Sequence, residues 1–414
     1  MATAGSYPTS DVDTSYAWTR LALSVIVGTI ACVGNWSVIV ALPTIQVEFE
    51  TIRGGASLPY TCAMIGFALG GVAMGRLADR YGLTIPILIG AVLLLAGYAL
   101  AAQAGTLWQF ALAHGLLIGP GAAAGFAPVI SDLSHWFRKR RGLAVAIAAS
   151  GSYLAGTIWP VVIEHFISTQ GWRPTHLGIG VFCVVTLVPL AFLMRRRPAA
   201  EEMHAAEQAT DVARADLGLS SRALQSLLVL AGFACCMAMS MPQVHIVAYC
   251  GDLGYGVAIG TQILSLMLGL GVVSRLASGF VADRIGGGPM LILGSAMQAS
   301  ALILYVFFNS LSSLYVISGL FGLFQGGIVP MYAVLIRQFL PPREAGARIG
   351  LVLMATVLGM AAGGLISGVI FDLTASYRLA FLHGFAWNLV NLSIVAWLTL
   401  RPRGRGAVSA QGRA

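Results

Sequence analysis

The sequence predicts an all-α membrane protein of twelve transmembrane helices, arranged as two pseudo-symmetric six-helix halves. Three observations support this fold class. Of the 414 residues, 57% are hydrophobic and only 10% are charged, whereas soluble domains carry about 25% charged residues. Apolar runs long enough for a span of about 20 residues follow one another along nearly the whole chain. Local motifs of the first half recur in the second, which indicates an internal duplication.

Each apolar run is expected to form a helix, because lipid offers no hydrogen-bond partner to an open backbone. The first run is too long for a signal peptide and is expected to be retained as a span. The expected spans are 19–43, 57–77, 85–103, 107–132, 142–166, 176–194, 223–249, 258–281, 288–308, 312–338, 346–371 and 378–400.

A polar segment between the sixth and seventh spans divides the chain. The expected organisation is a cytoplasmic N-terminal tail (1–18), an N-terminal half (19–194), a cytoplasmic linker (195–222), a C-terminal half (223–400) and a cytoplasmic C-terminal tail (401–414). The linker is expected to be either a surface helix or a disordered segment.

Arginine supplies nearly all of the positive charge, and Lys139 is the only lysine. Cytoplasmic loops of membrane proteins are enriched in arginine and lysine. Placing the N-terminus inside leaves only Arg53, Arg173 and Arg378 outside and Arg275 within a span. We therefore expect a multi-pass protein of the cell (inner) membrane with both termini in the cytoplasm. The net charge of +8 alone would suit a nucleic-acid partner, but the placement of the basic residues indicates orientation in a bilayer, so membrane lipids and no nucleic acid are expected as partners.

Two motifs of the first half recur in the second. The first comprises Gly75, Asp79, Arg80 and Gly82 after the second span, and Gly279, Asp283, Arg284 and Gly286 after the eighth, at an offset of 204 residues. The second comprises Gly125, Pro128 and Phe137, and Gly327, Pro330 and Phe339, at an offset of 202 residues. Many secondary transporters are duplicated in this way, with the substrate site between the repeats. The first motif is therefore expected to act in gating.

The stretch from Gly75 to Gly82 resembles the signature of the major facilitator superfamily, which lies between the second and third spans, and the stretch from Gly279 resembles it again. The basic residues that usually follow the last glycine are absent in both copies. The resemblance implies the major facilitator fold, transport by alternating access, and no enzymatic activity.

A closer resemblance links the stretches from Gly119 to Ala144 and from Val273 to Arg284 to the monocarboxylate transporter and oxalate/formate antiporter branch. In that branch an arginine of the eighth span binds the substrate carboxylate, and Arg275 matches that position. Two features differ: the acid one turn earlier is replaced by glycine, and the eleventh span has no lysine. The resemblance implies a monocarboxylate substrate, carried by proton symport or anion exchange.

An arginine at the centre of a span costs about 2.5 to 3.5 kcal/mol on insertion scales. Arg275 is therefore expected to bind an anion, or else to snorkel to the surface or bind a backbone carbonyl. The other candidate substrate-binding residues, each weighed against simple core packing, are Tyr332, Asn35, Trp36, Tyr153 and Phe126. His245, toward the outer end of the seventh span, is either a proton-coupling residue or a surface histidine.

Other polar residues within spans are interpreted structurally. Asn388 and Asn391 are expected to join helices, and Asp132 is expected to be a solvated carboxylate at a helix end. No nucleotide or metal motif occurs in the sequence, so no cofactor, metal or enzymatic activity is expected.

The expected function is secondary active transport of a small organic anion, with protons as a further partner, by a monomer. The alternatives are an efflux transporter for a hydrophobic drug or sugar, and a nutrient receptor that does not transport.

Overall fold

The computed structural model describes residues 13–137, 141–196, 220–339 and 342–401. Within these residues, twelve helical segments are long and apolar enough to cross a membrane, and none of the described residues forms a strand. The expected all-α fold of twelve spans is confirmed. Most of the expected tails and linker, namely 1–12, 197–219 and 402–414, lies outside the described residues, as do 138–140 of the basic loop.

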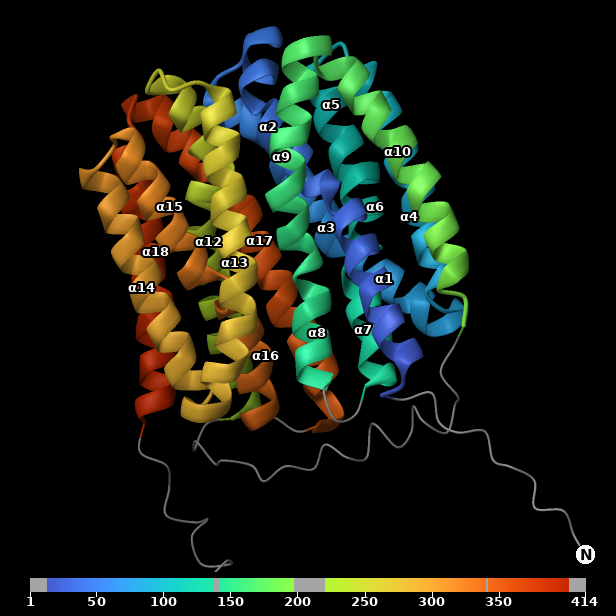
Figure 1. The fold of residues 1–414 in the computed structure, drawn as a ribbon. Coiled ribbons are helices and arrows are strands. Elements are labelled where there is room, and N and C mark those ends of the chain that lie inside the picture. The colour runs from blue at the N-terminus through green and yellow to red at the C-terminus, as the bar shows by residue number, and fades with distance from the viewer. Residues whose placement is uncertain (1–12, 138–140, 197–219, 340–341, 402–414) are drawn as a thin grey trace, which may run out of the picture.

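The helices are α1 (Ser15–Ala31), α2 (Val33–Glu48), α3 (Arg53–Tyr81), α4 (Thr84–Ala102), α5 (Leu107–Ala113), η1 (His114–Ile118), α6 (Gly119–Ala123), α7 (Ala127–Trp136), α8 (Arg141–Ala149), α9 (Gly151–Gln170), α10 (Trp172–Leu193), α12 (Ser221–Asp252), α13 (Val257–Ile285), α14 (Gly287–Phe307), α15 (Leu311–Gln325), α16 (Ile328–Phe339), α17 (Pro342–Thr374) and α18 (Tyr377–Leu400). Figure 1 shows α1 to α10 on one side of the bundle and α12 to α18 on the other. Helix α1 begins and α18 ends at the lower end, which we call the inner end.

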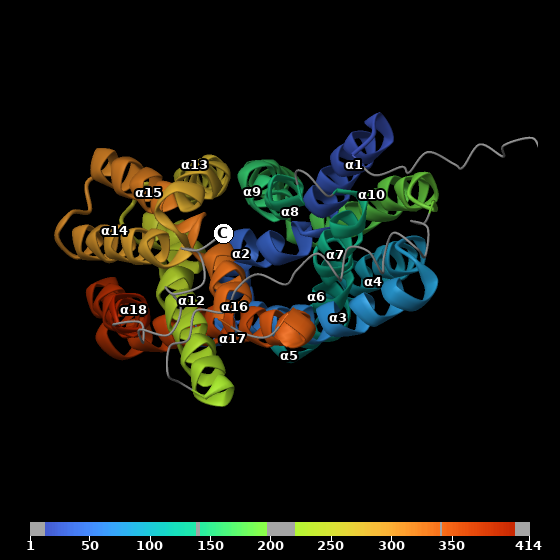
Figure 2. The same ribbon diagram turned by 90° about the horizontal axis from the view of Figure 1, so that it is seen from below.

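The two halves meet along two seams (Figure 2). Helix α9 packs on α13 along the first seam, and α3 packs on α17 along the second. In the second seam a Cβ added to Gly368 would lie 3.0 Å from the Cα of Gly54. The Thr61 hydroxyl there donates a hydrogen bond to the carbonyl of Ala361 at 3.0 Å. The halves are therefore in close contact along the outer part of this seam.

Two spans at equivalent positions in the halves are broken. The fourth span runs from α5 through the five-residue π-helical turn η1 into α6, and then breaks at Gly125 ahead of Pro128. The tenth breaks at Gly326 and Gly327 ahead of Pro330. Proline has no backbone N–H and cannot continue the hydrogen bonding of the preceding turn. The duplicated glycine and proline motif therefore marks a helix break in each half.

Glycine allows helices of the same half to pack closely. A Cβ at Gly322 of α15 would overlap the carbonyl oxygen of Met267 on α13, and a Cβ at Gly66 of α3 would overlap that of Gly115 on η1. Small residues at helix interfaces permit such close backbone approach in membranes. Much of the high glycine content thus serves packing within the halves.

Buried polar side chains also join helices. Asn388 donates to the Ser295 carbonyl at 2.7 Å and Asn391 to the Ser295 hydroxyl at 2.8 Å, so their expected joining role is confirmed. Asp132 of α7 forms an ion pair with Arg20 of α1, with relative exposures of 12% and 1%. The expectation of a solvated Asp132 is wrong, because hydropathy does not reveal the cation that lies opposite a carboxylate.

Candidate functional site

Arg275 lies in the inner half of α13, with only 6% of its surface exposed. Its Nε donates to the carbonyl of Gly326 at 3.1 Å, and its Nη1 donates to the carbonyl of Ala149 at 2.6 Å. Gly326 lies at the break between α15 and α16, and Ala149 is the last residue of α8. Carbonyls at helix ends lack partners within the helix, so the breaks supply both acceptors. Because these acceptors belong to different halves, the guanidinium links the two halves.

No acid compensates this guanidinium in the part of the chain that the structure describes. The ion pairs found there are Arg20 with Asp132, Arg53 with Asp252, and Arg173 with Glu48. A charge inside a membrane is costly and usually pairs with another charge, binds carbonyls or faces water. Two carbonyl dipoles stabilise the guanidinium of Arg275 but leave its positive charge uncompensated. This arrangement suits a site that receives an anion.

Tyr153 of α9 places its aromatic face on the guanidinium. The Cζ atom of Arg275 lies 4.2 Å from the ring centroid, within the range of a cation–π interaction. The same ring fills the space beside Gly271, one turn before Arg275, where an added Cβ would lie 2.6 Å from two ring carbons. An aromatic ring thus stands where the monocarboxylate branch carries an acid.

Trp36 of α2 packs on the same stretch of α9. Its Nε1 donates to the carbonyl of Ser152 at 3.1 Å, and its ring lies 2.7 Å from the position of a Cβ added to Gly156. The structure therefore places Trp36 and the Arg275 group on one stretch of the first seam. Asn35, the neighbour of Trp36, has a buried Oδ1 with no hydrogen-bond partner in the described residues, so this acceptor is unused in the present conformation.

Tyr332 and Phe126 make their contacts within their own halves. The Tyr332 hydroxyl donates to Asn391 Oδ1 at 2.6 Å and also contacts a backbone carbonyl of α12. The ring of Phe126 packs on that of Phe67 in α3, with 5.8 Å between centroids. Neither side chain hydrogen bonds to the Arg275 guanidinium or stacks on it within the described residues.

His245 of α12 is completely buried. Its Nε2 lies 2.8 Å from the Gly364 carbonyl of α17, and a carbonyl only accepts, so Nε2 carries the hydrogen. Its Nδ1 is buried and has no partner in the described residues. The alternative of a surface histidine is wrong, because α17 covers α12 at this level. The imidazole also lies 5.7 Å from the ring of Tyr377, measured between centroids.

The charged motif residues lie at the inner ends of α3 and α13. Asp79, Arg80 and Arg284 are exposed, and within the described residues none of them forms an ion pair. The Arg80 guanidinium lies 5.2 Å from the ring of Tyr81. The side chain of Asp283 lies outside those described. Ion pairs of these residues across the inner end are thus absent from the described part of this conformation.

The motif glycines have two different environments. Gly82 and Gly286 end α3 and α13 with φ of 79° and 89°, a left-handed conformation that glycine adopts readily. A Cβ added to Gly75 or Gly279 would meet no atom within 4 Å. The two end glycines are therefore required by the backbone, whereas the two earlier ones face open space in this conformation.

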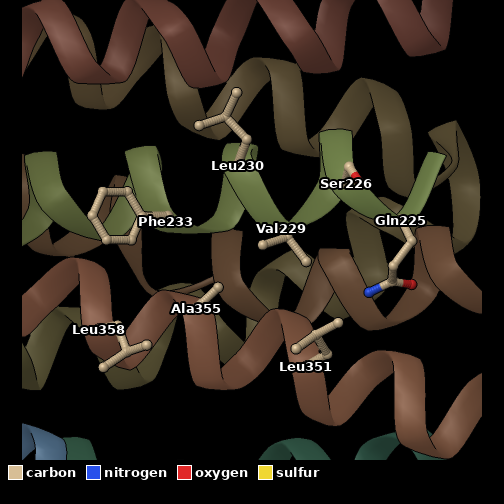
Figure 3. A pocket seen from close by; sticks show the side chains of 8 residues that line it. All are labelled: Gln225, Ser226, Val229, Leu230, Phe233, Leu351, Ala355 and Leu358. Atoms are coloured by element: carbon tan, nitrogen blue, oxygen red, sulfur yellow. The ribbon is translucent and has the colours of Figure 1, made fainter. Parts of the chain in front are cut away.

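A groove of about 410 Å³ lies between α12 and α17 (Figure 3), and Arg275 is not among the residues that line it. Its lining residues are Gln225, Ser226, Val229, Leu230, Phe233, Leu351, Ala355 and Leu358. Figure 3 shows Val229 of α12 and Leu351 of α17 pointing into the space between the two helices. The lining has no charged side chain, so the groove does not offer an anion site.

Twelve apolar helices in two halves, joined by a guanidinium that has no acid partner among the described residues, are typical of a membrane transport protein. The model of the Major Facilitator Superfamily matches residues 24–317 and 271–414. The chain belongs to this superfamily, which confirms the resemblance seen in its motifs. It is a secondary transporter that crosses the membrane many times, and it is not an enzyme.

Relatives of known name are transporters as well. The chain is 27% identical to the MFS-type transporter pynF of Aspergillus niger, over 89% of this chain and 85% of the relative. It is 26% identical to monocarboxylate transporter 13 of Bos taurus, over 81% and 79%. It is 24% identical to an agnestins efflux protein of Paecilomyces divaricatus, over 78% and 72%.

Among solved structures, the fold is similar to an inward-facing, occupied bacterial homologue of the human lysosomal transporter Spinster, with a TM-score of 0.72 and 13% identity over 95% of this chain and 100% of the other. It is equally similar to the nucleoside transporter NupG, with a TM-score of 0.72 and 14% identity over 92% and 99%. At these identities the likeness concerns the fold alone.

Proposed function

We propose that the protein moves a small monocarboxylate across the cell membrane by alternating access, with Arg275 as the anion anchor. One observation carries the proposal: a buried guanidinium binds a carbonyl from each half and has no acid partner in the described residues. A guanidinium matches a carboxylate through two parallel hydrogen bonds. An arriving carboxylate would replace the Ala149 carbonyl at Nη1 and so break a bond that joins the halves. Substrate binding and movement of the halves are thereby coupled.

The surrounding residues favour a small substrate with one negative charge. Tyr153 and Trp36 provide aromatic walls, and the unpartnered Oδ1 of Asn35 could accept a hydrogen bond from a hydroxyl group of the substrate but not from its carboxylate. The eleventh span has no lysine, so a dicarboxylate would lack a second cation there. The likeness to a monocarboxylate transporter supports the same substrate class. Tyr332 and Phe126 would reach the substrate only in another conformation.

Coupling and orientation complete the proposal. His245 is the candidate proton carrier, because its buried Nδ1 has no partner in the described residues and a proton could reach it only when the outer end opens. The excess of arginine at the inner end supports a cytoplasmic position for both termini. The motif residues Asp79 and Arg80 are proposed to close the inner end in the opposite conformation. The transporter is proposed to act as a monomer.

The experiment that tests this proposal compares Arg275→Ala and Arg275→Lys with the parent protein in proteoliposomes. Uptake of labelled lactate or pyruvate is measured together with stabilisation of the purified protein by the same acids. Removing a hydrogen-bonded charge partner costs about 2 to 5 kcal/mol of binding, which is roughly thirty-fold or more in affinity. Alanine should abolish carboxylate binding, and lysine should weaken it severely, since it lacks the planar fork.

The matched control is Arg222→Ala, which removes an exposed arginine near the inner end. It should leave lactate binding unchanged. Oxalate should compete less well than lactate for the parent protein. Normal carboxylate transport by a well-folded Arg275→Ala variant would show that the anchor is wrong.

Efflux of a larger apolar compound is the second candidate function. The likeness to an efflux protein of Paecilomyces divaricatus favours it. The same stabilisation measurement distinguishes the two, because ligands that bind the native state stabilise it by mass action. Stabilisation by hydrophobic compounds and not by small carboxylates would replace the monocarboxylate proposal with this one.

A further inference from the structure

The first turn of α3 receives its cap from the opposite half. The residue before the helix is Ile52, whose side chain cannot accept a hydrogen bond, so α3 has no cap of its own. Instead, Asp372 near the end of α17 accepts from the backbone N–H of Arg53 at 2.8 Å and of Gly54 at 2.6 Å. Its carboxylate also compensates the positive end of the α3 dipole. The cap exists only while the two halves touch at the outer end.

The side chain of Arg53 makes the reciprocal contact. Its Nη2 donates to both carboxylate oxygens of Asp252, at 2.9 Å each, and Asp252 is the last residue of α12. The guanidinium lies 5.0 Å from the ring of Phe371 and 5.9 Å from that of Tyr377. The Arg53 side chain is 7% exposed and that of Asp252 is 37% exposed. The N-terminal half thus supplies the cation of an ion pair with the C-terminal half, and the C-terminal half supplies the carboxylate that caps α3.

We propose that Arg53, Asp252 and Asp372 form the outer gate of this transporter, a clasp that breaks whenever the outer end opens. Each contact joins one half to the other, so the halves cannot separate here while the clasp holds. Beneath it the second seam is sealed by Ser57, which is completely buried, and by Gly368. Opening of the clasp would therefore admit water to this seam.

Two unpartnered donors of Arg53 favour the opening of the clasp. The Nε and Nη1 atoms of Arg53 are buried without a partner in the described residues, and a buried donor without a partner raises the free energy of the state that holds it. Water would satisfy these donors as soon as the halves part. The closed state is therefore held by the two carboxylates against this opposing effect, and loss of either carboxylate should shift the balance toward opening.

The first test measures water access to the seam. Ser57→Cys is introduced as a reporter in a variant whose native cysteines are replaced, and a membrane-impermeant maleimide is added from outside. Arg53→Ala and Asp372→Ala should each speed labelling about tenfold, which corresponds to about 1.4 kcal/mol. Arg378→Ala, which removes an exposed arginine at the same end, is the matched control and should leave the rate unchanged.

A double variant separates the gate from general damage. Arg53→Ala with Asp252→Ala should label no faster than Arg53→Ala alone, since the two side chains act on each other. Unchanged labelling of both Arg53→Ala and Asp372→Ala would overturn the proposal. Equal acceleration by Arg378→Ala would overturn it too, because surface charge would then explain the effect.

The second test follows the inner end. Spin labels at Ala73 of α3 and Gly350 of α17, both exposed, report the separation of these helices at that end. Breaking the clasp should shorten this distance, because opening at one end accompanies closure at the other in alternating access. Faster labelling of Ser57→Cys with an unchanged distance between the two spin labels would indicate local unfolding at the outer end and would refute the proposal. Neither test uses a substrate, so both stand apart from the monocarboxylate proposal.

Discussion

Removal of the Asp132 carboxylate should destabilise the protein strongly. Arg20 donates to Asp132 through Nε at 2.7 Å and through Nη2 at 2.9 Å, and its Nη1 reaches the Met194 carbonyl at 3.2 Å. The guanidinium also lies 4.7 Å from the ring of Trp136. With exposures of 1% and 12%, the pair is well shielded from water. Breaking such a pair leaves a buried charge uncompensated and costs about 3 to 5 kcal/mol.

The magnitude should depend on which partner is removed. Asp132→Ala is expected to cost about 3 kcal/mol or more, roughly a hundredfold in the ratio of folded to unfolded protein. Replacing both partners, as Arg20→Met with Asp132→Leu, should cost less, because no charge is then left buried. Arg173→Ala is the control, since it breaks an ion pair whose side chains are 43% and 31% exposed and should change stability by less than about 1 kcal/mol.

Thermal unfolding of the purified protein in detergent, followed by tryptophan fluorescence and by the folded fraction on size exclusion, measures the effect. The order of stability should be the parent and Arg173→Ala, then the double variant, then Asp132→Ala. If Asp132→Ala unfolds at the same temperature as the parent, the ion pair contributes little to the stability of the protein. If the double variant is the least stable, packing around Arg20 matters more than its charge.

His245→Gln should flatten the dependence of uptake on outside pH while counterflow exchange stays active, because glutamine retains an N–H for the Gly364 carbonyl and takes up no proton. An unchanged pH profile in proteoliposomes would leave His245 with a packing role. For the orientation, an impermeant maleimide added to intact cells should label Gly251→Cys and not Gly350→Cys, which are exposed positions at opposite ends of the bundle. Labelling of Gly350→Cys and not of Gly251→Cys would show that the orientation is the reverse of the one proposed.

The twelve spans could be predicted because hydropathy reports directly on contact with lipid and with the apolar interior. Their lengths could not: α3 runs from Arg53 to Tyr81, whereas the expected span covers 57–77. Polar residues that extend a helix beyond the hydrocarbon do not interrupt its backbone hydrogen bonds. Boundaries read from hydropathy therefore stop short of the helix ends.

The position of Arg275 within a span could be predicted from the sequence, and a backbone carbonyl was one of its expected partners, but the particular carbonyls could not be predicted. Backbone carbonyls leave no trace in side-chain patterns. The available signal was the Ser150–Gly151 pair between α8 and α9 and the Gly326–Gly327 pair between α15 and α16, next to the two carbonyls. His245 and Tyr332 show the same limit, because each is held by a helix far away in sequence.

The outer clasp was hidden for a related reason. From the sequence, Arg53 is recognised only as one of three arginines on the outer side of the membrane. Its partners lie 199 and 319 residues further along the chain. The signal that could have drawn attention to it is a helix that opens on Ile52 without a polar residue to cap it. In α3 the cap comes instead from Asp372, on a helix of the other half.

The contact between Tyr153 and Gly271 limits how this transporter can change by mutation. An acid at position 271 would neutralise Arg275 from one turn away, but its Cβ would overlap the ring of Tyr153. A single substitution there would therefore meet a steric barrier, and the ring would first have to shrink or move. An acid at position 271 is therefore more readily accepted in this protein together with a smaller residue at position 153 than alone. The packing of the Tyr153 ring thus limits which substitutions position 271 can accept.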